Sequence, residues 1–279
     1  MTVRPSTVAL ALLASVVLAA CARDQKSSAQ DDDDDDDSAR SAAASPSTAA
    51  AQPADSSHLV TAPRSTAGAA APAPQGAPGA PTQTGTTTWT FDSSQVGSPP
   101  SGFSFGRTGK GRLGTWVVRA APDAPSAPNV LAQEDNDNTD YRFPVAVADA
   151  PSFRDVSVSV RCKPVSGRVD QACGIVWRYQ DENNYYLTRA NALEDNVCWY
   201  YVQNGRRVEV KRVHVRVASG VWHSLRADMR GDHVEVYFND KKLIDVHDSR
   251  FTAPGRVGVW TKADSRTLFD NLTATNLGS

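Results

Sequence analysis

Between Val156 and Val210 the chain alternates apolar and polar residues, and this alternation constrains the fold more than any other feature of the 279-residue sequence. Successive side chains of a β-strand point to opposite faces, so a period of two predicts strands with one buried face. The apolar positions of the first two segments are Val156, Val158, Val160 and Cys162, followed by Cys173, Ile175, Trp177 and Tyr179. We expect these segments to pair as a hairpin with Cys162 opposite Cys173, because that register puts their apolar side chains on one face.

A second hairpin is predicted around Asn204-Gly205, a two-residue loop in which both positions accept a positive φ. Pairing the residues on either side of this loop gives a core face made of Val197, Trp199, Tyr201, Val208 and Val210. Trp177 is likewise expected in the core. The residues that follow the two tryptophans, Arg178 and Tyr200, are expected on the opposite face of the sheet.

The first twenty residues have the pattern of a bacterial secretion signal, with an apolar stretch, Val8–Ala20, too short to span a bilayer. The stretch runs into Leu18-Ala19-Ala20-Cys21, which resembles the lipoprotein box, where the chain is cleaved before the cysteine and the cysteine is lipidated. We expect Cys21 to carry a lipid anchor; the alternative is an ordinary secretory signal with an incidental cysteine. The residue after the cysteine is Ala22 and not Asp, which resembles lipoproteins that are sorted to the outer membrane and not retained in the inner membrane. The expected location is therefore the bacterial cell envelope, with the outer membrane as the anchoring membrane.

Residues 21–86 are expected to form a disordered tether, because they are rich in Ala, Ser, Pro, Gln and Gly and cannot bury enough surface to offset ordering. The run Asp31–Asp37 repels itself and is interpreted as a solvated spacer, with an export or cation-attracting tag as the alternative. Residues 1–87 hold 9 acidic and 5 basic residues, which leaves 22 acidic and 24 basic residues in 88–279. That balance does not indicate a nucleic-acid partner.

Three cysteines lie in the folded part. Cys162 and Cys173 face each other in the expected register, within bridging range for opposed strand residues. An exported chain reaches an oxidising compartment. We therefore expect a disulfide between Cys162 and Cys173, which leaves Cys198 unpaired or as the alternative partner.

Residues 87–279 are expected to form one all-β domain. Short alternating segments recur along it, separated by loops rich in Pro, Gly, Asp and Asn, and it contains no amphipathic helix of credible length. About a dozen short strands at this spacing predict an antiparallel two-sheet sandwich.

Three segments of the domain are informative when taken together, namely GIVWRYQDENNYYLTR, WHSLRADMRGDHVEVYFNDKKLI and GRVGVWTKADSRTLFDNL. In these segments the chain resembles the concanavalin A-like lectin/glucanase family of jelly rolls, nearest its laminin G-like and 3-keto-disaccharide-hydrolase-like bacterial branch. The resemblance covers roughly Trp89 to Thr275. Its most telling parts are Trp222-His223-Ser224-Leu225 and Phe269-Asp270-Asn271. It implies two stacked sheets, one with a concave outer surface, and carbohydrate binding on that surface or its rim loops.

Glycan binding needs an aromatic face for the sugar C–H groups, flanked by planar hydrogen-bonding groups. Four residues on the expected non-core face match this need, namely Arg178, Tyr185, Arg189 and Tyr200. We interpret them as a glycan-binding surface. The alternative is a solvated outer face with stabilising cross-strand pairs.

A structural calcium ion is the one cofactor that the resemblance implies, held by a carboxylate near the first strand and one on the last strand. The matching residues are Asp92 and Asp270. The alternative is two unrelated polar residues at strand ends. A further acidic run, Glu134–Asp140, lacks the glycine and the distal glutamate of an EF-hand loop and is interpreted as an exposed turn.

No catalytic set is expected. The glucanases of the resembling family carry Glu-x-Asp-x-x-Glu on one strand, which holds two carboxylates about 5–5.5 Å apart, and the chain has no such run. The sequence thus predicts a lipid-anchored envelope protein whose jelly-roll domain binds a glycan noncovalently. Two alternatives stay open: a glycoside-active hydrolase of the 3-keto-disaccharide-hydrolase-like branch, and a laminin G-like module that binds a protein partner.

Overall fold

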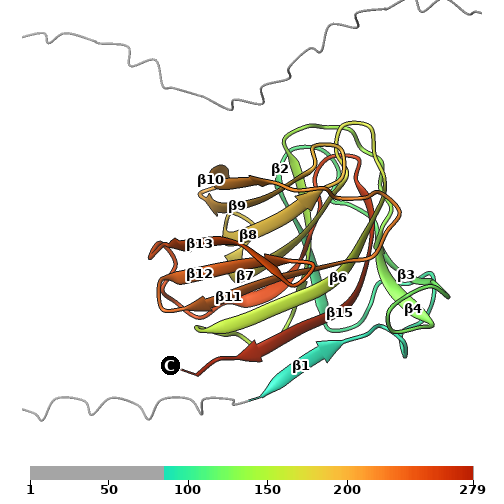
Figure 1. Cartoon of the computed structure of the whole chain (residues 1–279). Coiled ribbons are helices and arrows are strands. Elements are labelled where there is room, and N and C mark those ends of the chain that lie inside the picture. The colour runs from blue at the N-terminus through green and yellow to red at the C-terminus, as the bar shows by residue number, and fades with distance from the viewer. Residues whose placement is uncertain (1–84, 279) are drawn as a thin grey trace, which may run out of the picture. The chain divides into compact units, whose positions relative to one another are not determined.

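The folded part of the chain is a sandwich of two antiparallel β-sheets (Figure 1). The computed structural model describes residues 85–278, which contain fifteen strands and no helix. The eight-stranded sheet contains β1 (Thr86–Trp89), β3 (Trp116–Ala120), β4 (Asn129–Gln133), β6 (Val156–Ser166), β11 (His223–Arg230), β12 (His233–Phe238), β13 (Lys241–His247) and β15 (Arg266–Asn276). The seven-stranded sheet contains β2 (Phe103–Gly109), β5 (Arg142–Ala148), β7 (Ala172–Asp181), β8 (Asn184–Asn191), β9 (Asn196–Gln203), β10 (Arg206–His214) and β14 (Arg256–Trp260). The predicted all-β, two-sheet sandwich is confirmed.

Many neighbouring strands in each sheet are distant in the sequence. The order of the larger sheet is β13-β12-β11-β6-β15-β4-β3, with β1 added to β15, and that of the smaller sheet is β10-β9-β8-β7-β14-β5-β2. The consecutive strands β14 and β15 lie inside different sheets. Loops from distant parts of the chain are therefore brought together at the two ends of the sandwich.

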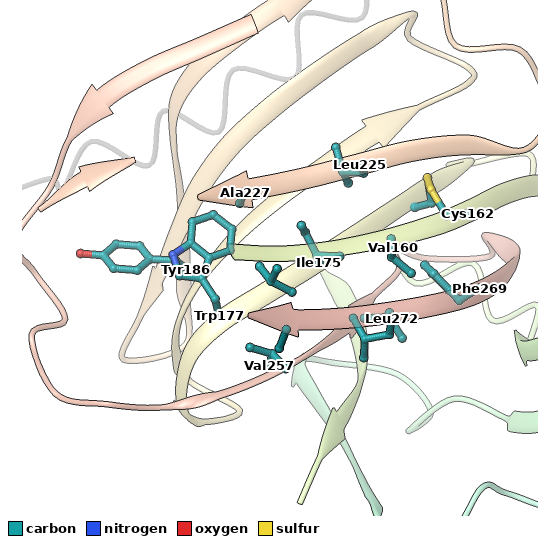
Figure 2. Close-up of a cluster of buried hydrophobic side chains, with 14 of the residues drawn as sticks. Val160, Cys162, Ile175, Trp177, Tyr186, Leu225, Ala227, Val257, Phe269 and Leu272 are labelled. Atoms are coloured by element: carbon teal, nitrogen blue, oxygen red, sulfur yellow. A yellow bond between two sulfur atoms is a disulfide. The ribbon is translucent and has the colours of Figure 1, made fainter. Parts of the chain in front are cut away.

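The apolar faces of the two sheets meet in one buried core (Figure 2). Val160 and Phe269 come from the larger sheet, and Ile175 and Trp177 from the smaller one; each is at most 1% exposed. Full burial of a large apolar side chain contributes roughly 1.5–3 kcal/mol. The predicted core positions of Trp177 and Trp199 are confirmed, since both are 0% exposed.

The predicted hairpin between the first two alternating segments is wrong. β6 pairs with β11 and β15, whereas β7 pairs with β8 and β14. The two strands therefore lie in opposite sheets, and their apolar faces oppose each other across the core. Alternation shows which side chains are buried, but the pattern is the same whether the apolar partner lies beside the strand or across from it.

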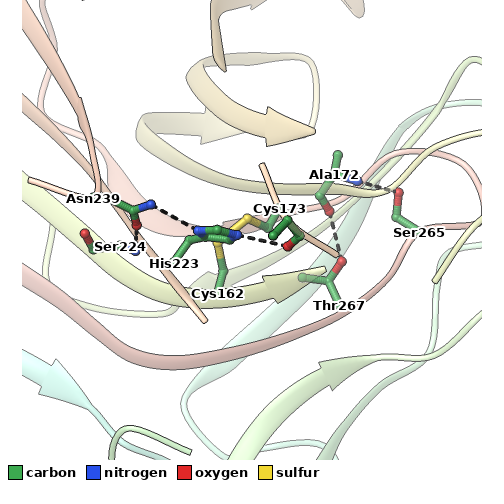
Figure 3. The surroundings of a disulfide bond; sticks show 9 residues. Cys162, Ala172, Cys173, His223, Ser224, Asn239, Ser265 and Thr267 are labelled. Atoms are coloured by element: carbon green, nitrogen blue, oxygen red, sulfur yellow. Dashed lines mark hydrogen bonds between the residues drawn. A yellow bond between two sulfur atoms is a disulfide. The ribbon is translucent and has the colours of Figure 1, made fainter. Parts of the chain in front are cut away.

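A disulfide joins Cys162 of β6 to Cys173 of β7 and thereby links the two sheets through the core (Figure 3). The Cα atoms of the two cysteines lie 6.2 Å apart. Beside this link, the Thr267 hydroxyl of β15 donates to the Ala172 carbonyl of β7 at 2.9 Å. Cys198 is buried and forms no disulfide. The Cys162–Cys173 disulfide joins residues with a sequence separation of 11. In the chain-entropy account, closing a loop of about this length stabilises a fold by about 3 kcal/mol.

The hairpin at Asn204-Gly205 pairs as predicted next to its loop. A β-bulge after Glu209 then shifts the register, so Lys211 rather than Val210 lies opposite Trp199. Val210 is 42% exposed, and its predicted place in the core is wrong. The shift follows from one extra residue in β10, which turns the later side chains to the other face.

The signal peptide predicted for residues 1–20, the lipidated Cys21 and nearly all of the tether predicted for residues 21–86 lie outside the described residues. In the described part, β1 begins at Thr86. No helix among residues 85–278 has the length and apolar composition needed to cross a membrane.

Candidate functional site

The seven-stranded sheet curls so strongly that its outer face becomes an interior. Tyr185 of β8 and Thr108 of β2 are four strand intervals apart, which is roughly 19 Å along a flat sheet at about 4.8 Å per interval. Their hydroxyl groups nevertheless lie 2.8 Å apart. Thr108 also donates to the Glu182 carbonyl in the β7–β8 turn. The edge strand β2 therefore closes against a hairpin from the far half of the sheet.

A second apolar cluster fills the inside of this curl, and its members are at most 6% exposed. Among them are Phe143, Val145, Val147, Val176, Tyr179, Tyr185, Leu187, Tyr200, Val202 and Trp260. The guanidinium of Arg207 lies over this cluster, 4.4 Å from the centroid of the Phe143 ring and 4.7 Å from that of Tyr200. Such cation–aromatic contacts are favourable where water is excluded. Side chains thus occupy the concave outer surface that the resemblance implied.

The surface set predicted from the sequence is buried. Arg178, Tyr185, Arg189 and Tyr200 are each at most 2% exposed, so the expected open aromatic and arginine surface is wrong. Three of them, Tyr185, Arg189 and Tyr200, do share the inner face of the curl. Arg189 donates to the Tyr200 hydroxyl at 3.0 Å, and Tyr185 packs in the apolar cluster. A glycan approaching from solvent does not meet these aromatic rings.

Arg178 points away from the other three because β7 contains a bulge at this position. Its φ is +45°, and the register between β7 and β8 shifts after Trp177. The guanidinium instead donates to the backbone carbonyls of Arg154, Phe251 and Gly231 and to the Asp155 carboxylate. These contacts satisfy a buried charge at one end of the sandwich. An arginine with a positive φ has no sequence signal, so the alternation could not reveal the change of face.

A network of buried polar groups lies around Arg189 at the other end of the sandwich. Arg189 donates to the Glu194 carboxylate at 2.7 Å and to the Asn196 side-chain carbonyl, besides its bond to Tyr200. Burial alone would raise the pKa of Glu194, but the nearby charge of Arg189 lowers it below its usual value. The carboxylate is therefore held ionised beside its partner.

Asp170 belongs to the same network and is 0% exposed. Burial raises its pKa to about 6, against the opposing charges of Arg189 and Lys262. The Lys262 ammonium lies 3.6 Å from Asp170 and 3.0 Å from the exposed Asp140. A strongly shifted buried carboxylate often marks a functional site. Because Asp170 is fully buried and its charged neighbours are Arg189 and Lys262, we interpret it as a group that holds these cations in place.

Four loops meet at this end, namely residues 134–141, 167–171, 192–195 and 261–265. Their contact is direct. Lys262 pairs with Asp140, the Asp264 carboxylate accepts from the backbone N–H of Arg168, and the Ala192 N–H donates to the Gln171 carbonyl at 3.0 Å. A cavity of about 730 Å³ lies here between the first two loops, Asp264 of the fourth loop and the start of β15. We call it the four-loop hollow after this end of the sandwich, although residues 192–195 do not line it. Its lining includes Asn136, Asn138, Ser166, Arg168, Val169 and Arg266.

The acidic run that begins at residue 134 forms one wall of the hollow, and its side chains alternate in direction. Asp135 forms two hydrogen bonds with the Arg112 guanidinium, at 2.8 and 2.9 Å. Asp137 accepts from the backbone N–H of Arg112 at 2.6 Å. Asn136 and Asn138, in contrast, are exposed and line the hollow. The interpretation as an exposed turn is therefore wrong for Asp135 and Asp137, whose hydrogen bonds hold the loop in place, whereas Asp140 and the two asparagines are exposed.

The opposite wall is fixed by the Asp264 carboxylate. It accepts three backbone hydrogen bonds, from Arg168 at 2.7 Å, Val169 at 3.0 Å and Asp170 at 3.1 Å. A Cβ atom on Gly167 would lie 1.8 Å from the Asp170 carbonyl oxygen, so this turn admits only glycine. Both walls are thus built before any ligand arrives, which lowers the entropy cost of binding.

The lining residues Asn136, Asn138, Arg168 and Arg266 were not predicted from the sequence. One signal was present: the alternation Asp-Asn-Asp-Asn inside the acidic run suggests two kinds of environment. The arginines have no such signal, because their proximity depends on the pairing of β15 with β6, in which Arg266 lies opposite Ser166.

The two carboxylates predicted as calcium ligands are brought together by the loop that precedes β4. The Ser126 N–H donates to Asp270 at 2.6 Å, and the Ser126 hydroxyl donates to Asp92 at 2.9 Å. Asp270 is 0% exposed; burial raises its pKa, and the charge of Asp92 acts in the same direction. All four carboxylate oxygens accept protein hydrogen bonds, from Ser126, Asn129 and Asn271, so a Ca²⁺ ion held by this pair would share its oxygen ligands with these donors while offsetting the repulsion between the two charges.

Comparison with known proteins supports the fold and gives a partial sequence match. No family model matches the chain. A segment of 96 residues is 29% identical to a levanase from Bacillus subtilis (strain 168), and the match spans 34% of this chain but only 14% of the levanase. The carbohydrate-binding module CBM66 from Bacillus subtilis superposes with a TM-score of 0.51 at 20% identity, over 65% of this chain and all of the module. The chain has a concanavalin A-like sandwich fold.

Proposed function

We propose that the folded domain binds carbohydrate noncovalently and that the four-loop hollow is its binding site. The observation that carries this proposal is a preformed cavity of about 730 Å³ lined by planar hydrogen-bonding side chains on two fixed loops. The similarity to a carbohydrate-binding module and to part of a levanase supports the same function. Cavities of this size are typical of sites for small ligands or for one end of a larger one.

The binding chemistry would be mostly polar. The Asn138 amide offers two donors and one acceptor oxygen, which suits the paired hydroxyl groups of a sugar. The Asn136 amide adds two donors, while its oxygen already accepts from Arg112 at 3.3 Å. The guanidiniums of Arg168 and Arg266 add further planar donors. Val169, 41% exposed at the wall, provides an apolar surface for sugar C–H groups.

A glycan array probed with the full chain, followed by titration of the best ligand, tests this proposal. We expect Asn138→Ala to weaken binding about tenfold, since lost hydrogen bonds of this kind cost about 1 kcal/mol each. The matched control is Thr252→Ala, in a cavity of about 370 Å³ at the opposite end of the sandwich. Absence of any glycan ligand would refute the function, and a loss caused by Thr252→Ala alone would move the site to that other end.

We also propose that Cys21 anchors the domain to the bacterial envelope through lipid. The support is the small-residue sequence before this cysteine at the end of an apolar stretch. Acyl chains contribute roughly 0.8 kcal/mol per buried CH₂ group. In cell fractionation, the natural chain should sediment with outer membranes, whereas Cys21→Ser should appear among soluble exported proteins. Membrane recovery of the variant would rule the anchor out.

A structural Ca²⁺ ion between Asp92 and Asp270 is a third proposal, supported by their convergence on Ser126. At a free calcium concentration a hundred times Kd, binding to the folded state alone adds about 2.7 kcal/mol. For a domain of this size that is roughly 5–10 °C in Tm. We expect a chelator to lower the Tm of the natural chain by this amount and to leave that of Asp270→Asn unchanged. A Tm that does not respond to calcium or chelator in either chain would contradict the proposal.

A further inference from the structure

The exposed charged side chains that line the four-loop hollow are basic. Arg168 and Arg266 are both exposed and line the hollow. Among residues 85–278, neither guanidinium makes an ion pair within 4 Å. The hollow therefore presents two cationic forks that the protein itself does not neutralise.

The nearby carboxylates are already engaged. Asp135 is paired with Arg112, and Asp264 accepts the three backbone hydrogen bonds of the opposite wall. The pKa of Glu134 is lowered chiefly by its hydrogen bonds with Arg119 and to a smaller extent by the charge of Arg266. The two Glu134 oxygens accept from Arg119 at 2.8 and 2.6 Å. Asp264 also lines the hollow, but it is 8% exposed and its oxygens face the backbone N–H groups, so the exposed charges that a ligand meets there are those of the two arginines.

The two arginines are also close to each other in the fold. Arg266 begins β15 and lies directly opposite Ser166 at the end of β6. Arg168 follows Ser166 by two residues, on the loop that Asp264 fixes. Two guanidiniums that start from neighbouring backbone positions can contact one carboxylate together or the carboxylates of two successive sugar units.

We propose that the four-loop hollow selects acidic glycans, that is, chains of sugars bearing carboxylate groups such as uronic acids. This inference rests on the proposed carbohydrate binding at the same site. A guanidinium holds a carboxylate through two parallel hydrogen bonds, which are shorter and stronger than those to neutral hydroxyls. The amides of Asn136 and Asn138 then read the sugar hydroxyls, so charge and sugar are recognised by different residues.

The test compares three probes with the full chain by isothermal titration calorimetry at fixed ionic strength. The probes are oligogalacturonate, the neutral oligosaccharide made by reducing its carboxyl groups, and polyglutamate of similar charge. We expect oligogalacturonate to bind at least tenfold more tightly than the neutral oligosaccharide and at least tenfold more tightly than polyglutamate. The double variant Arg168→Ala/Arg266→Ala should lose at least tenfold for oligogalacturonate and should lose the preference itself, so that oligogalacturonate and the neutral oligosaccharide bind within about twofold of each other.

Two further variants keep the result interpretable. Arg154→Ala removes an exposed arginine at the opposite end of the sandwich and should bind all three probes as the natural chain does. Arg168→Lys/Arg266→Lys keeps the charge but loses the paired hydrogen bonds, so it should retain only part of the preference. Unchanged Tm values show that the variants are folded.

The outcomes separate this inference from the proposed function. If the neutral oligosaccharide binds as tightly as oligogalacturonate, selection for acidic glycans is wrong while carbohydrate binding stands. If polyglutamate binds as tightly as oligogalacturonate, charge alone is recognised, and the inference is again overturned. If no glycan on the array binds at all, the proposed function fails first and takes this inference with it.

Discussion

Replacing Trp260 with alanine is expected to lower the free energy of unfolding by about 3–5 kcal/mol, the usual cost of truncating a buried tryptophan. Trp260 belongs to β14 and points to the outer face of its sheet, yet it is 0% exposed. It stacks on Phe143 with ring centroids 5.4 Å apart. Trp199, in contrast, lies in the core between the two sheets. Because the inside of the curl is packed like a second core, we expect Trp260→Ala and Trp199→Ala to lower the free energy of unfolding by similar amounts.

Chemical denaturation of the full chain, followed by circular dichroism, measures both variants. The control is Trp222→Ala, because Trp222 is only partly buried and should cost less. A loss below about 1 kcal/mol for Trp260→Ala would mean that the concave face is open to solvent. In that case the aromatic surface around Tyr185 and Tyr200 would again become a candidate glycan platform.

The second large effect is expected for Arg189→Met, which removes one partner of a buried ion network. Such a loss costs about 3–5 kcal/mol, because the remaining buried charge is left uncompensated. The matched control is Arg212→Met, whose pair with Glu209 is more than a third exposed on the arginine side. Exposed pairs contribute about 0–1 kcal/mol, so the control should stay near the natural chain.

The cost of Arg189→Met should depend on pH through Asp170. The pKa of Asp170 in the folded state, about 6, lies above its value in the unfolded state. The stability that Asp170 contributes while it is protonated is therefore lost as the pH rises through 6. Arg189 opposes that rise. Without it the pKa of Asp170 should climb further, and the variant should lose more stability at pH 7.5 than at pH 4.5. An equal loss at both values would show that Asp170 does not sense Arg189.

The burial of individual strands was predictable because it depends on local alternation. Val156 to Cys162 are buried on alternate positions of β6 as predicted, and Trp177 and Trp199 lie in the core. The register at the Asn204-Gly205 turn was also predictable, since the turn type restricts the pairing next to it. Each of these features is determined by residues within one or two strands.

The candidate site was not predictable, because curvature and pairing across the whole sheet decide it. The bulge at Arg178 reverses one side chain, and the curl that brings Thr108 to Tyr185 buries the rest of the predicted surface. The exposed arginines of the hollow become neighbours only when β15 pairs with β6.

By itself, the sequence determined that the domain is all-β and that the alternating apolar rows of strands such as β6 are buried, because alternation is a property of a single strand. Only the tertiary structure decided what those side chains face, since a row of apolar residues packs equally well beside another strand or across from it. The same holds for Arg168 and Arg266, whose shared hollow comes from long-range strand pairing that no local pattern encodes.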